Sequence, residues 1–564
     1  MTVSQANGKS DIMAPDGIIT TIPSLAFLRV PVKEHVKIFL LLALSIFFLP
    51  ISYAIAITLT AVPPSVLAYF QPFSRSTLTG ALFHRTQCRA KPTFRQRTIL
   101  VTGVGMTKGL TLARAFWLCG YRVVAADFDV GSCAAWTPWK KGRWSYSLAF
   151  DAVYSLRRPV VKDGMDDREK EEVRTAYTRD ICKIVEDEVV DLWVSCSGVA
   201  SAVEDAMVKE ALDKVSPSPR GRRRCACIQF DVPTTSTLHE KSAFIRHTKA
   251  LKLTVPETFE VTSQAEVLDA LASATRENPG RKFILKPVGM DDANRGNMTL
   301  LPLPTARETG SFVRRLPVSR ARPWILQQFI RGGREYCTHA LVVGGAVKVF
   351  AACPSSELLM HYEALPADDP LTAEMLDFTT KFAAAAGAGF TGHLSFDFMA
   401  EEDGDGGARL YAIECNPRAH TAVALFAQPG EQMRWMVEAY ASAVNAPLKP
   451  LKAMGNSGAA PGMVWPPADA TPRYWIGHDF VTRALLPWLN LLLWKPGSGG
   501  LLVDGVGELV QHVLYWKDGT FELWDPWPFV ALYHHYWPRA ILASWWKGEQ
   551  WSRLNVSTTK MFIC

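Results

Sequence analysis

The chain has 564 residues, of which 48% are hydrophobic and 20% are charged, and its formal net charge at pH 7 is +7. This length suits about three or four domains, and the composition excludes an intrinsically disordered chain. The basic excess is mild and lies mainly in residues 75–97 and 220–224, without the aromatic-interleaved basic stripe of a nucleic-acid-binding domain, so we expect no nucleic-acid partner.

The cysteines indicate a reducing compartment. Eleven are scattered along the chain, and the close pair Cys225 and Cys227 has no second pair and no suitably spaced histidines. We therefore expect free thiols and no zinc site of the cysteine-rich kind.

An apolar tract is the first expected element, within an N-terminal region of residues 1–97. Residues 38–62 carry no charge, and roughly 20 apolar residues span the hydrocarbon core of a bilayer. Pro50 interrupts the tract, so a kinked spanning helix and a membrane-dipping hairpin are both open, and a buried core helix is the non-membrane alternative. No acidic residue lies between Ile38 and Arg97, and the downstream flank is basic, which predicts a membrane anchor with the rest of the chain in the cytosol.

Residues 98–232 alternate between strand-like and helical patterns, which predicts a parallel, doubly wound α/β domain. β-branched or apolar runs occupy residues 98–104, 122–126, 190–195 and 226–230. A glycine turn, GVGMTKG, follows the first run. Lys108 stands where the dinucleotide pattern GxGxxG requires its third glycine, although Asp127 lies at the spacing of a ribose-binding acid. Dinucleotide binding is the weaker alternative, because the helix start after such a turn can bind any anionic substrate group.

Residues 233–450 predict a second, antiparallel α+β domain. Strand-like runs lie at residues 283–286, 324–330, 335–343, 346–352, 393–399 and 409–415. Gly344 and Gly345 separate two of these runs by the length of a tight hairpin turn. Residues 371–386 are expected to form a helix between strands.

Residues 451–564 form a tryptophan-rich C-terminal region, with ten of the chain's 18 tryptophans between Trp475 and Trp551. The apolar run at residues 485–494 is too short to span a bilayer. Tryptophan is frequent at membrane–water interfaces. An interfacial membrane surface and an aromatic-rich packing domain are both consistent with this composition.

The segments HLSFDF and RLYAIECNPRAH carry the residues expected to act chemically. Side chains alternate between the two faces of a strand, so Glu414 and Asn416 share one face and Cys415 points away. If the two strands pair antiparallel through the acidic turn at residues 403–407, Asp397 joins Glu414 and Asn416. Two carboxylates and an amide oxygen are hard ligands that suit Mg²⁺, and Arg418 is placed to stabilise a transferred phosphoryl group. Two amphipathic strands with solvated charges are the alternative.

The order of polar residues resembles the ATP-grasp superfamily over residues 98–440. The matching positions are Lys241, Lys286, Gln327, Gln328, Phe329, Ile330, Glu335, Asp397, Glu414, Asn416 and Arg418. The resemblance implies an ATP-grasp fold, in which an α/β pre-grasp domain precedes two α+β lobes that enclose ATP.

Carried over residue by residue, the resemblance implies a role for each position. Lys241 and Lys286 would bind ATP phosphates, the hinge strand Gln327 to Ile330 together with Glu335 would hold the nucleotide, and Asp397, Glu414 and Asn416 would bind Mg²⁺ or alternatively Mn²⁺. Arg418 and Lys286 would act on the transferred phosphate. Two departures stand out: Gln328 replaces an acidic residue that often binds ribose, and VGMDDANRGNMTLLP replaces the usual glycine-rich phosphate loop.

Motifs along most of the chain are similar to one branch, the ligases of mycosporine biosynthesis. They include GMTKGLTLARAF, KPVGMDDANRGNMTLLP, GREYCTHALV, AACPSSELLMHYE, YWIGHD and DPWPFVALYHH. The resemblance implies an ADP-forming ligase that joins an amino acid, typically glycine, to an enolic acceptor, 4-deoxygadusol. The loop after Lys286 and residues 335–363 are expected to select the acceptor, and the polar candidates beside it are His339, Ser355, Ser356, His393 and His420.

Two other functions remain open from the sequence. One is a ligase of the same fold that makes an amide through an acyl phosphate. The other, of a different class, is a membrane-attached ATP-binding scaffold without turnover. The acceptor, the amine, the membrane involved and the oligomeric state are not fixed by the sequence.

Overall fold

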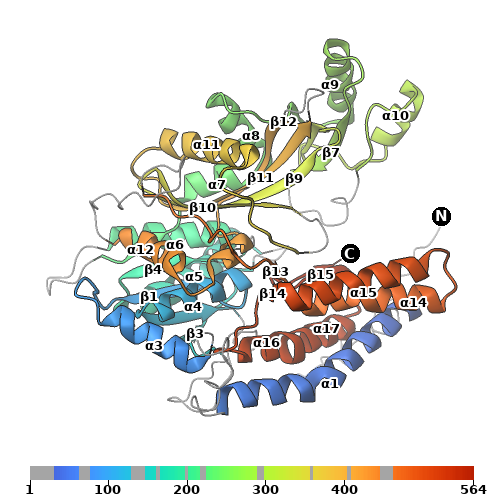
Figure 1. The fold of residues 1–564 in the computed structure, drawn as a ribbon. Coiled ribbons are helices and arrows are strands. Elements are labelled where there is room, and N and C mark those ends of the chain that lie inside the picture. The colour runs from blue at the N-terminus through green and yellow to red at the C-terminus, as the bar shows by residue number, and fades with distance from the viewer. Residues whose placement is uncertain are drawn as a thin grey trace, which may run out of the picture.

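The computed structural model describes residues 31–61, 77–128, 147–160, 165–196, 198, 201–215, 224–288, 298–355, 360–402, 408–444 and 462–563. Its main parts are a parallel sheet, two antiparallel sheets and a layer of helices contributed by both ends of the chain (Figure 1).

The first sheet is parallel throughout, as predicted, with the strand order β3-β2-β1-β4-β5. Its strands are β1 (Thr98–Thr102), β2 (Arg122–Asp127), β3 (Ala152–Ser155), β4 (Leu192–Ser195) and β5 (Ala226–Ile228). The helices of this part are α3 (Leu78–Arg89), α4 (Thr107–Leu118), α5 (Asp167–Asp187), α6 (Ala202–Lys214) and α7 (Val232–His239). Side chains of β1 alternate between two cores: Ile99 packs with residues of α4, and Leu100 packs with residues of α5 and α6. The sheet is therefore doubly wound.

The strand order reverses between β1 and β4, and such a switch point opens a crevice at the carboxyl ends of the strands. Gly103 follows β1 here, with φ +72. A Cβ on Gly103 would lie 2.7 Å from the carbonyl oxygen of Cys196, which follows β4. The glycine turn is thus required by the close approach of two backbones, and α4 begins directly after it.

A three-stranded antiparallel sheet of order β6-β8-β7 follows. It contains β6 (Thr258–Val261), β7 (Phe283–Pro287) and β8 (Trp324–Gln328), and the nearby helices are α8 (Lys241–Ala250), α9 (Gln264–Glu277) and α10 (Ala306–Val313). The predicted hinge strand is shorter than expected, because β8 ends at Gln328 and leaves Phe329 and Ile330 in the connection to the next sheet.

The second antiparallel sheet has four strands in the order β10-β9-β11-β12. They are β9 (Arg334–Val343), β10 (Ala346–Pro354), β11 (Gly392–Glu402) and β12 (Ala408–Asn416), followed by η3 (Thr421–Phe426) and α12 (Glu431–Ser442); α11 (Pro370–Ala385) lies between β10 and β11. The predicted hairpin between β9 and β10 is confirmed, with φ +60 at Gly344 and +73 at Gly345. The predicted antiparallel pairing of β11 with β12 is also confirmed. The acidic turn that joins them, at residues 403–407, lies outside the described residues.

The N-terminal apolar tract is a single helix, α1 (Val32–Ala61), that continues through Pro50, so the hairpin alternative does not match the structure. It is the one described helix long and apolar enough to cross a membrane, with a mean hydropathy of 2.5 over 18 residues of which 6% are buried. The alternative of a buried core helix does not match the structure either, because Phe39, Ile46 and Phe47 are about 70% exposed.

The C-terminal region folds against α1. Its elements are β13 (Arg473–Tyr474), α13 (Ile476–Asp479), η4 (Phe480–Leu485), α14 (Leu486–Leu492), α15 (Ser498–Tyr515), β14 (Lys517–Asp518), α16 (Trp527–Ala531), η5 (Leu532–Tyr536), α17 (Trp537–Trp546), β15 (Trp551–Asn555) and β16 (Lys560–Ile563). Figure 1 shows α1 beside α16 and α17, at the base of the molecule near α14 and α15. The hydroxyl of Tyr53 lies 2.7 Å from His535 Nε2, and Ser45 donates to the carbonyl of Tyr533 over 2.9 Å.

The C-terminal region is also anchored to the first sheet through α4. Arg114 and Asp525 form a buried ion pair of 2.8 Å, and the rings of Trp117 and Trp524 stack at 5.1 Å. The DPW motif is therefore a structural anchor for α4. The tryptophan-rich region combines both expected characters: Trp475 and Trp524 are buried, whereas Trp494, just after the end of α14, is 93% exposed.

Candidate functional site

The predicted carboxylate–amide cluster forms where β11 and β12 run side by side. Asp397 is paired with Glu414 across the two strands, and a β-bulge follows Asp397 directly. Asn416 Nδ2 donates to Asp397 Oδ2 over 3.1 Å. Cys415 points the other way, into the core with Phe396 and Phe398. Strand alternation thus places the three oxygen-bearing side chains on one face, as expected from the sequence.

Two cations extend this cluster. Arg418 Nη2 donates to Asn416 Oδ1 over 3.0 Å, and Lys241 Nζ lies 3.7 Å from Glu414 Oε2. Lys241 is the first residue of α8, as predicted, because the side chain of Glu240 caps that helix by accepting from Ser242 and Ala243. Lys241 and Glu414 are 26% and 29% exposed, so the pair is accessible to a ligand.

Lys286 contacts a different part of the predicted site. It lies on β7, and its Nζ donates to Gln327 Oε1 over 3.1 Å. Gln327 and Gln328 are buried, and the Gln328 side chain accepts from the backbone of Glu257 over 3.2 Å. Lys286 therefore contacts the hinge from β7, whereas Lys241 contacts the carboxylates from the start of α8, so the two predicted phosphate-binding lysines lie on different elements.

The expected acceptor-selecting segments are described only in part. Residues 289–297 and 356–359, which include Ser356, lie outside the described residues. Ser355 donates to Glu335 Oε1 over 3.1 Å, which ties the start of β9 to the end of β10. Glu335 is thus bound to Ser355, a contact that the sequence did not predict.

A buried lysine beside Arg418 was missed by the sequence analysis as a functional residue. Lys108 lies in the first turn of α4, at the switch point of the parallel sheet, and is 0% exposed. Burial first, and then the charge of Arg418, lower the pKa of Lys108 well below its usual value. The sequence feature that could have identified Lys108 is the glycine turn, in which this lysine replaces the third glycine of the dinucleotide pattern and lies at the start of a helix.

Three histidines surround the same region. His393 Nε2 lies 2.8 Å from the hydroxyl of Tyr440, and His339 Nδ1 accepts from the backbone N–H of His420 over 3.3 Å. Burial lowers the pKa of His339 and of His420 to about 3. Nearby Lys108 acts in the same direction on both pKa values, and Arg418 does so on that of His420. Burial also lowers the pKa of His393 well below its usual value, so all three imidazoles are neutral at pH 7, and the fixed positive charge here comes from Arg418.

His239, at the end of α7, was also missed. Burial and the charge of Arg418 lower its pKa, and Glu414 acts in the opposite direction. The imidazole thus lies close to both charged members of the cluster. Its position follows from the packing of α7 against β12, which no local pattern in the sequence predicts.

Asp127 does not favour the dinucleotide alternative. Its carboxylate accepts from the N–H of Gly105 over 2.6 Å and from that of Phe128 over 2.7 Å. The acid that would bind a ribose therefore holds the glycine turn in place.

No protein-family profile matches the sequence, and no curated protein matches it. Among solved structures, the chain is similar to N5-carboxyaminoimidazole synthetase from Staphylococcus aureus complexed with ADP, at 14% identity and a TM-score of 0.41, over 65% of this chain and 79% of that one. A carboxyaminoimidazole ribonucleotide synthase from Aspergillus clavatus complexed with ATP is 13% identical, with a TM-score of 0.41, over 67% and 80% of the two chains. The biotin carboxylase domain of a Hydrogenobacter thermophilus 2-oxoglutarate carboxylase, with MgADP, is 14% identical, with a TM-score of 0.40, over 61% and 69%.

These structural neighbours are ATP-grasp ligases. Because the identities and TM-scores are low, we base the function of this chain on the contacts of its own residues.

Proposed function

We propose that this chain is an ATP- and Mg²⁺-dependent, ADP-forming ligase of the ATP-grasp type, which joins the amine of an amino acid to a phosphate-activated acceptor. The observation that carries the proposal is the connected series Asp397–Asn416–Arg418, with the Glu414–Lys241 pair beside it. This series combines oxygen donors for a divalent cation with fixed positive charge for a phosphoryl group.

The donor set fits Mg²⁺, with Mn²⁺ as the alternative, because Asp397, Glu414 and Asn416 offer only carboxylate and amide oxygens. A bound ion would neutralise charge on the ATP phosphates. Asn416 Oδ1 accepts from Arg418 over 3.0 Å in the structure, so ligation through that oxygen requires it to share or release this hydrogen bond. Lys241 and Lys286 would bind the phosphates, and Gln327, Gln328, Phe329 and Ile330 would contact the adenine.

In the proposed reaction the γ-phosphoryl group of ATP passes to an oxygen of the acceptor and ADP leaves. The amine nitrogen then attacks the carbon that carries this oxygen, phosphate leaves with the C–O electron pair, and the nitrogen loses a proton. Arg418 stabilises the charge on the phosphoryl group during both steps. The fixed charge of Arg418 favours an anionic acceptor, and such an acceptor would also stabilise the protonated form of Lys108, whose pKa burial and Arg418 hold well below its usual value.

The acceptor that we favour is an enolic cyclohexenone of the 4-deoxygadusol type, with glycine as the amine. This preference comes from the resemblance to the ligases of mycosporine biosynthesis, and an ionised enol would be stabilised by Arg418 and would favour protonation of the buried Lys108. A carboxylate acceptor, which would give an amide through an acyl phosphate, uses the same phosphoryl-transfer residues and differs only in the acceptor.

Steady-state ADP release by full-length protein in detergent tests the proposal. We expect release with Mg·ATP, 4-deoxygadusol and glycine together, and a product whose mass is the sum of the two substrates less one water. Release only with carboxylic acids would indicate the amide-forming alternative. Nucleotide binding without release in any substrate pool would overturn the ligase and favour the scaffold.

We propose further that the protein is attached to a membrane through α1, with its catalytic body in the cytosol. Exposed apolar side chains support attachment, and they lie on α14 and α15 as well as on α1, including Trp488, Val503 and Leu514. The basic flank after α1 supports the cytosolic orientation. Recovery of full-length protein in the soluble fraction without detergent would contradict attachment, and protease protection of the body in sealed vesicles would contradict the orientation.

A further inference from the structure

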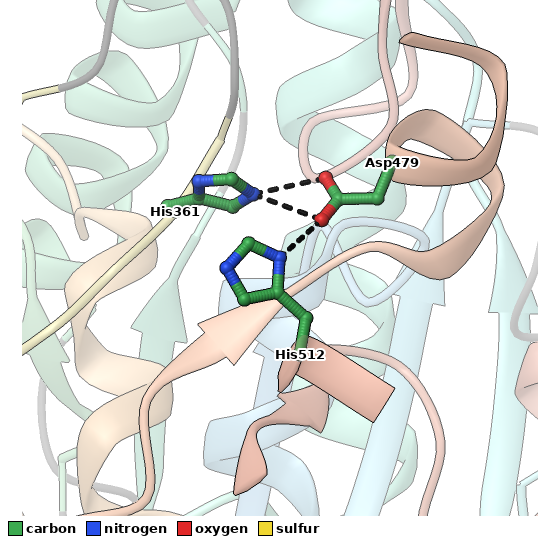
Figure 2. Close-up of side chains that lie close together, drawn as sticks. All are labelled: His361, Asp479 and His512. Atoms are coloured by element: carbon green, nitrogen blue, oxygen red, sulfur yellow. Dashed lines mark hydrogen bonds and ion pairs between the residues drawn. The ribbon is translucent and has the colours of Figure 1, made fainter. Parts of the chain in front are cut away.

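His361, Asp479 and His512 bring three ligand atoms together beside the C-terminal helices (Figure 2). His361 Nε2 lies 2.9 and 3.2 Å from the two carboxylate oxygens of Asp479, and His512 Nδ1 lies 2.6 Å from one of them. The ligand atoms all lie within 4.8 Å of one another. We propose that these residues form a binding site for a divalent transition-metal ion, for which Zn²⁺ is the best fit.

Three separate elements build this site. His361 precedes Tyr362, which is held by a β-bridge to Arg473, while Asp479 ends α13 and His512 lies in the last turn of α15. Asp479 is 0% exposed and His512 is 8% exposed. The site therefore joins the segment after β10 to the C-terminal helices, and its ligands are fixed by the backbone of three packed elements.

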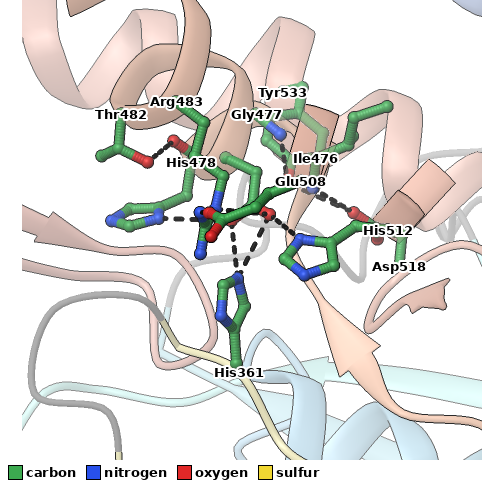
Figure 3. A network of polar contacts seen from close by, with 11 residues as sticks. His361, Ile476, Gly477, His478, Thr482, Arg483, Glu508, His512, Asp518 and Tyr533 are labelled. Atoms are coloured by element: carbon green, nitrogen blue, oxygen red, sulfur yellow. Dashed lines mark hydrogen bonds and ion pairs between the residues drawn. The ribbon is translucent and has the colours of Figure 1, made fainter. Parts of the chain in front are cut away.

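The charges around Asp479 favour a bound cation. Arg483 Nε approaches Asp479 only to 3.6 Å, and its guanidinium is in closer contact with Glu508 (Figure 3). His478 Nδ1 is more distant, at 3.8 Å. The buried carboxylate thus depends on the two histidines and on an arginine that it shares with a second carboxylate, and a cation bound between the imidazoles and Asp479 would supply an opposite charge of its own.

The donor chemistry distinguishes this site from the proposed Mg²⁺ site. Two imidazole nitrogens and one carboxylate oxygen suit Zn²⁺, whereas the cluster at Asp397 offers oxygens alone. Zinc bonds of about 2.0–2.1 Å in a tetrahedron separate ligand atoms by about 3.3 Å. The contact of 2.6 Å between His512 Nδ1 and Asp479 would lengthen by about 0.7 Å, and the three ligand atoms, which lie within 4.8 Å of one another, would close around the ion. Three protein ligands leave one position for water.

Aromatic rings enclose the two imidazoles. The centroid of Trp516 lies 5.2 Å from that of His361 and 4.3 Å from that of His512, and Tyr474 lies 5.6 Å from His512. These rings restrict rotation of the histidines and exclude water, which strengthens binding of a charged ligand. The cysteine pattern gave no sign of such a site, because the ligands are separated by 118 and 33 residues and include no cysteine.

The competing description is a hydrogen-bonded cluster in which the two histidines donate to Asp479. Measurement of metal content separates the two. Full-length protein is purified in detergent without added metal or affinity tags that bind metal, and its zinc is measured by mass spectrometry. We expect about one zinc per chain. After removal by a chelator, titration with Zn²⁺ should restore stoichiometric binding and raise the melting temperature, and Co²⁺ should give the visible absorption of a tetrahedral site.

The variants Asp479→Asn and His512→Gln should each lose zinc, whereas His478→Gln, which alters a neighbouring histidine outside the triad, should retain it. Asp479→Asn preserves the shape of the side chain, and circular dichroism shows whether it folds. Wild-type protein that neither contains nor binds Zn²⁺ or Co²⁺ overturns the proposal, whatever the variants do. The measurement uses no ATP and no acceptor, so it is independent of the ligase function, and Asp397→Asn should leave the zinc content unchanged.

Discussion

The side-chain amide of Asn416 bridges Asp397 and Arg418: its nitrogen donates to the carboxylate over 3.1 Å, and its oxygen accepts from the guanidinium over 3.0 Å. One residue thus connects the proposed metal ligands to the charge proposed for phosphoryl transfer. Asn416 is 8% exposed, and it ends β12 directly before Pro417. Its position is fixed by the strand, so its loss cannot be compensated by movement of a loop.

Asn416→Ala removes the side chain that connects the proposed metal ligand Asp397 to Arg418. We expect kcat for ADP formation to fall by about 10²-fold or more, because removing one preorganised polar contact at a charge-bearing site costs about that much. Glu414→Gln should have a similar effect. Glu438→Gln, on the exposed side of α12 and paired only with Arg434, is the control and should leave kcat unchanged. Normal turnover in Asn416→Ala would show that this cluster is not the phosphoryl-transfer site.

Replacement of the buried Lys108 separates acceptor binding from ATP binding. Lys108→Met keeps the length of the side chain and removes the amine, which an anionic acceptor would hold in its protonated form. We expect turnover with an anionic acceptor to fall at least about tenfold while ATP binding is retained, and thermal stability to be equal or higher, since a buried polar amine is costly. Lys183→Met, on the exposed face of α5, is the control. A large loss of stability with unchanged turnover would mean that Lys108 is structural only.

The buried histidines predict how stability depends on pH. The pKa of His339 is lowered to about 3 by burial, and the side chain is 0% exposed. In the unfolded chain His339 binds a proton as the pH falls below 6.5, its ordinary pKa, whereas in the folded chain it binds one only near pH 3. The stabilisation is therefore complete above pH 6.5 and is lost as the pH falls, at about 1.4 kcal/mol per pH unit for each such residue.

Denaturant titrations at pH 7 and pH 5 measure this dependence. Wild-type protein should lose stability between these values, and His339→Gln should lose less, because it removes one titrating group from the folded interior. An identical loss in both proteins would contradict neutral burial of His339. The exposed His247 provides the comparison, and His247→Gln should behave as the wild type.

The residues that the sequence predicted well are those fixed by local rules. Strand alternation placed Asp397, Glu414 and Asn416 on one face, the glycine pair placed the hairpin at Gly344, and a run of β-branched residues placed β1. Each of these depends on neighbours within a few residues. The ends of elements were less accurate, and the hinge strand stops at Gln328 because the chain must turn there into the next sheet.

The residues that the sequence missed are those defined by long-range packing. Lys108 comes close to Arg418 because the switch point of the parallel sheet packs against the strand ends of the four-stranded sheet. His361, Asp479 and His512 converge although 118 and 33 residues separate them. The DPW motif was read as part of a family resemblance, and only the fold shows Asp525 holding Arg114 of α4. No periodicity or spacing records such contacts.

The sequence predicts that α1 is a membrane anchor, and its contacts with the C-terminal helices predict a structural role as well. Ile38 and Ala56 are buried, Lys37 Nζ lies 3.6 Å from the centroid of the Trp551 ring, and Tyr53 bonds His535. Deletion of residues 1–61 should therefore lower the melting temperature in detergent, because it exposes the face of α16 and α17 that α1 covers. A truncated protein that is soluble and equally stable would show that α1 is a detachable anchor.

Two point substitutions on α1 distinguish its two faces. Tyr53→Phe keeps the ring against Trp527 and removes one hydrogen bond, so we expect a loss of about 1 kcal/mol in stability with membrane association unchanged. Phe47→Ser lies on the opposite, 68% exposed face, and should weaken retention in the membrane pellet while leaving the melting temperature in detergent unchanged. If both substitutions act only on membrane retention, α1 contacts lipid on all sides and does not pack against the C-terminal helices as the structure has it.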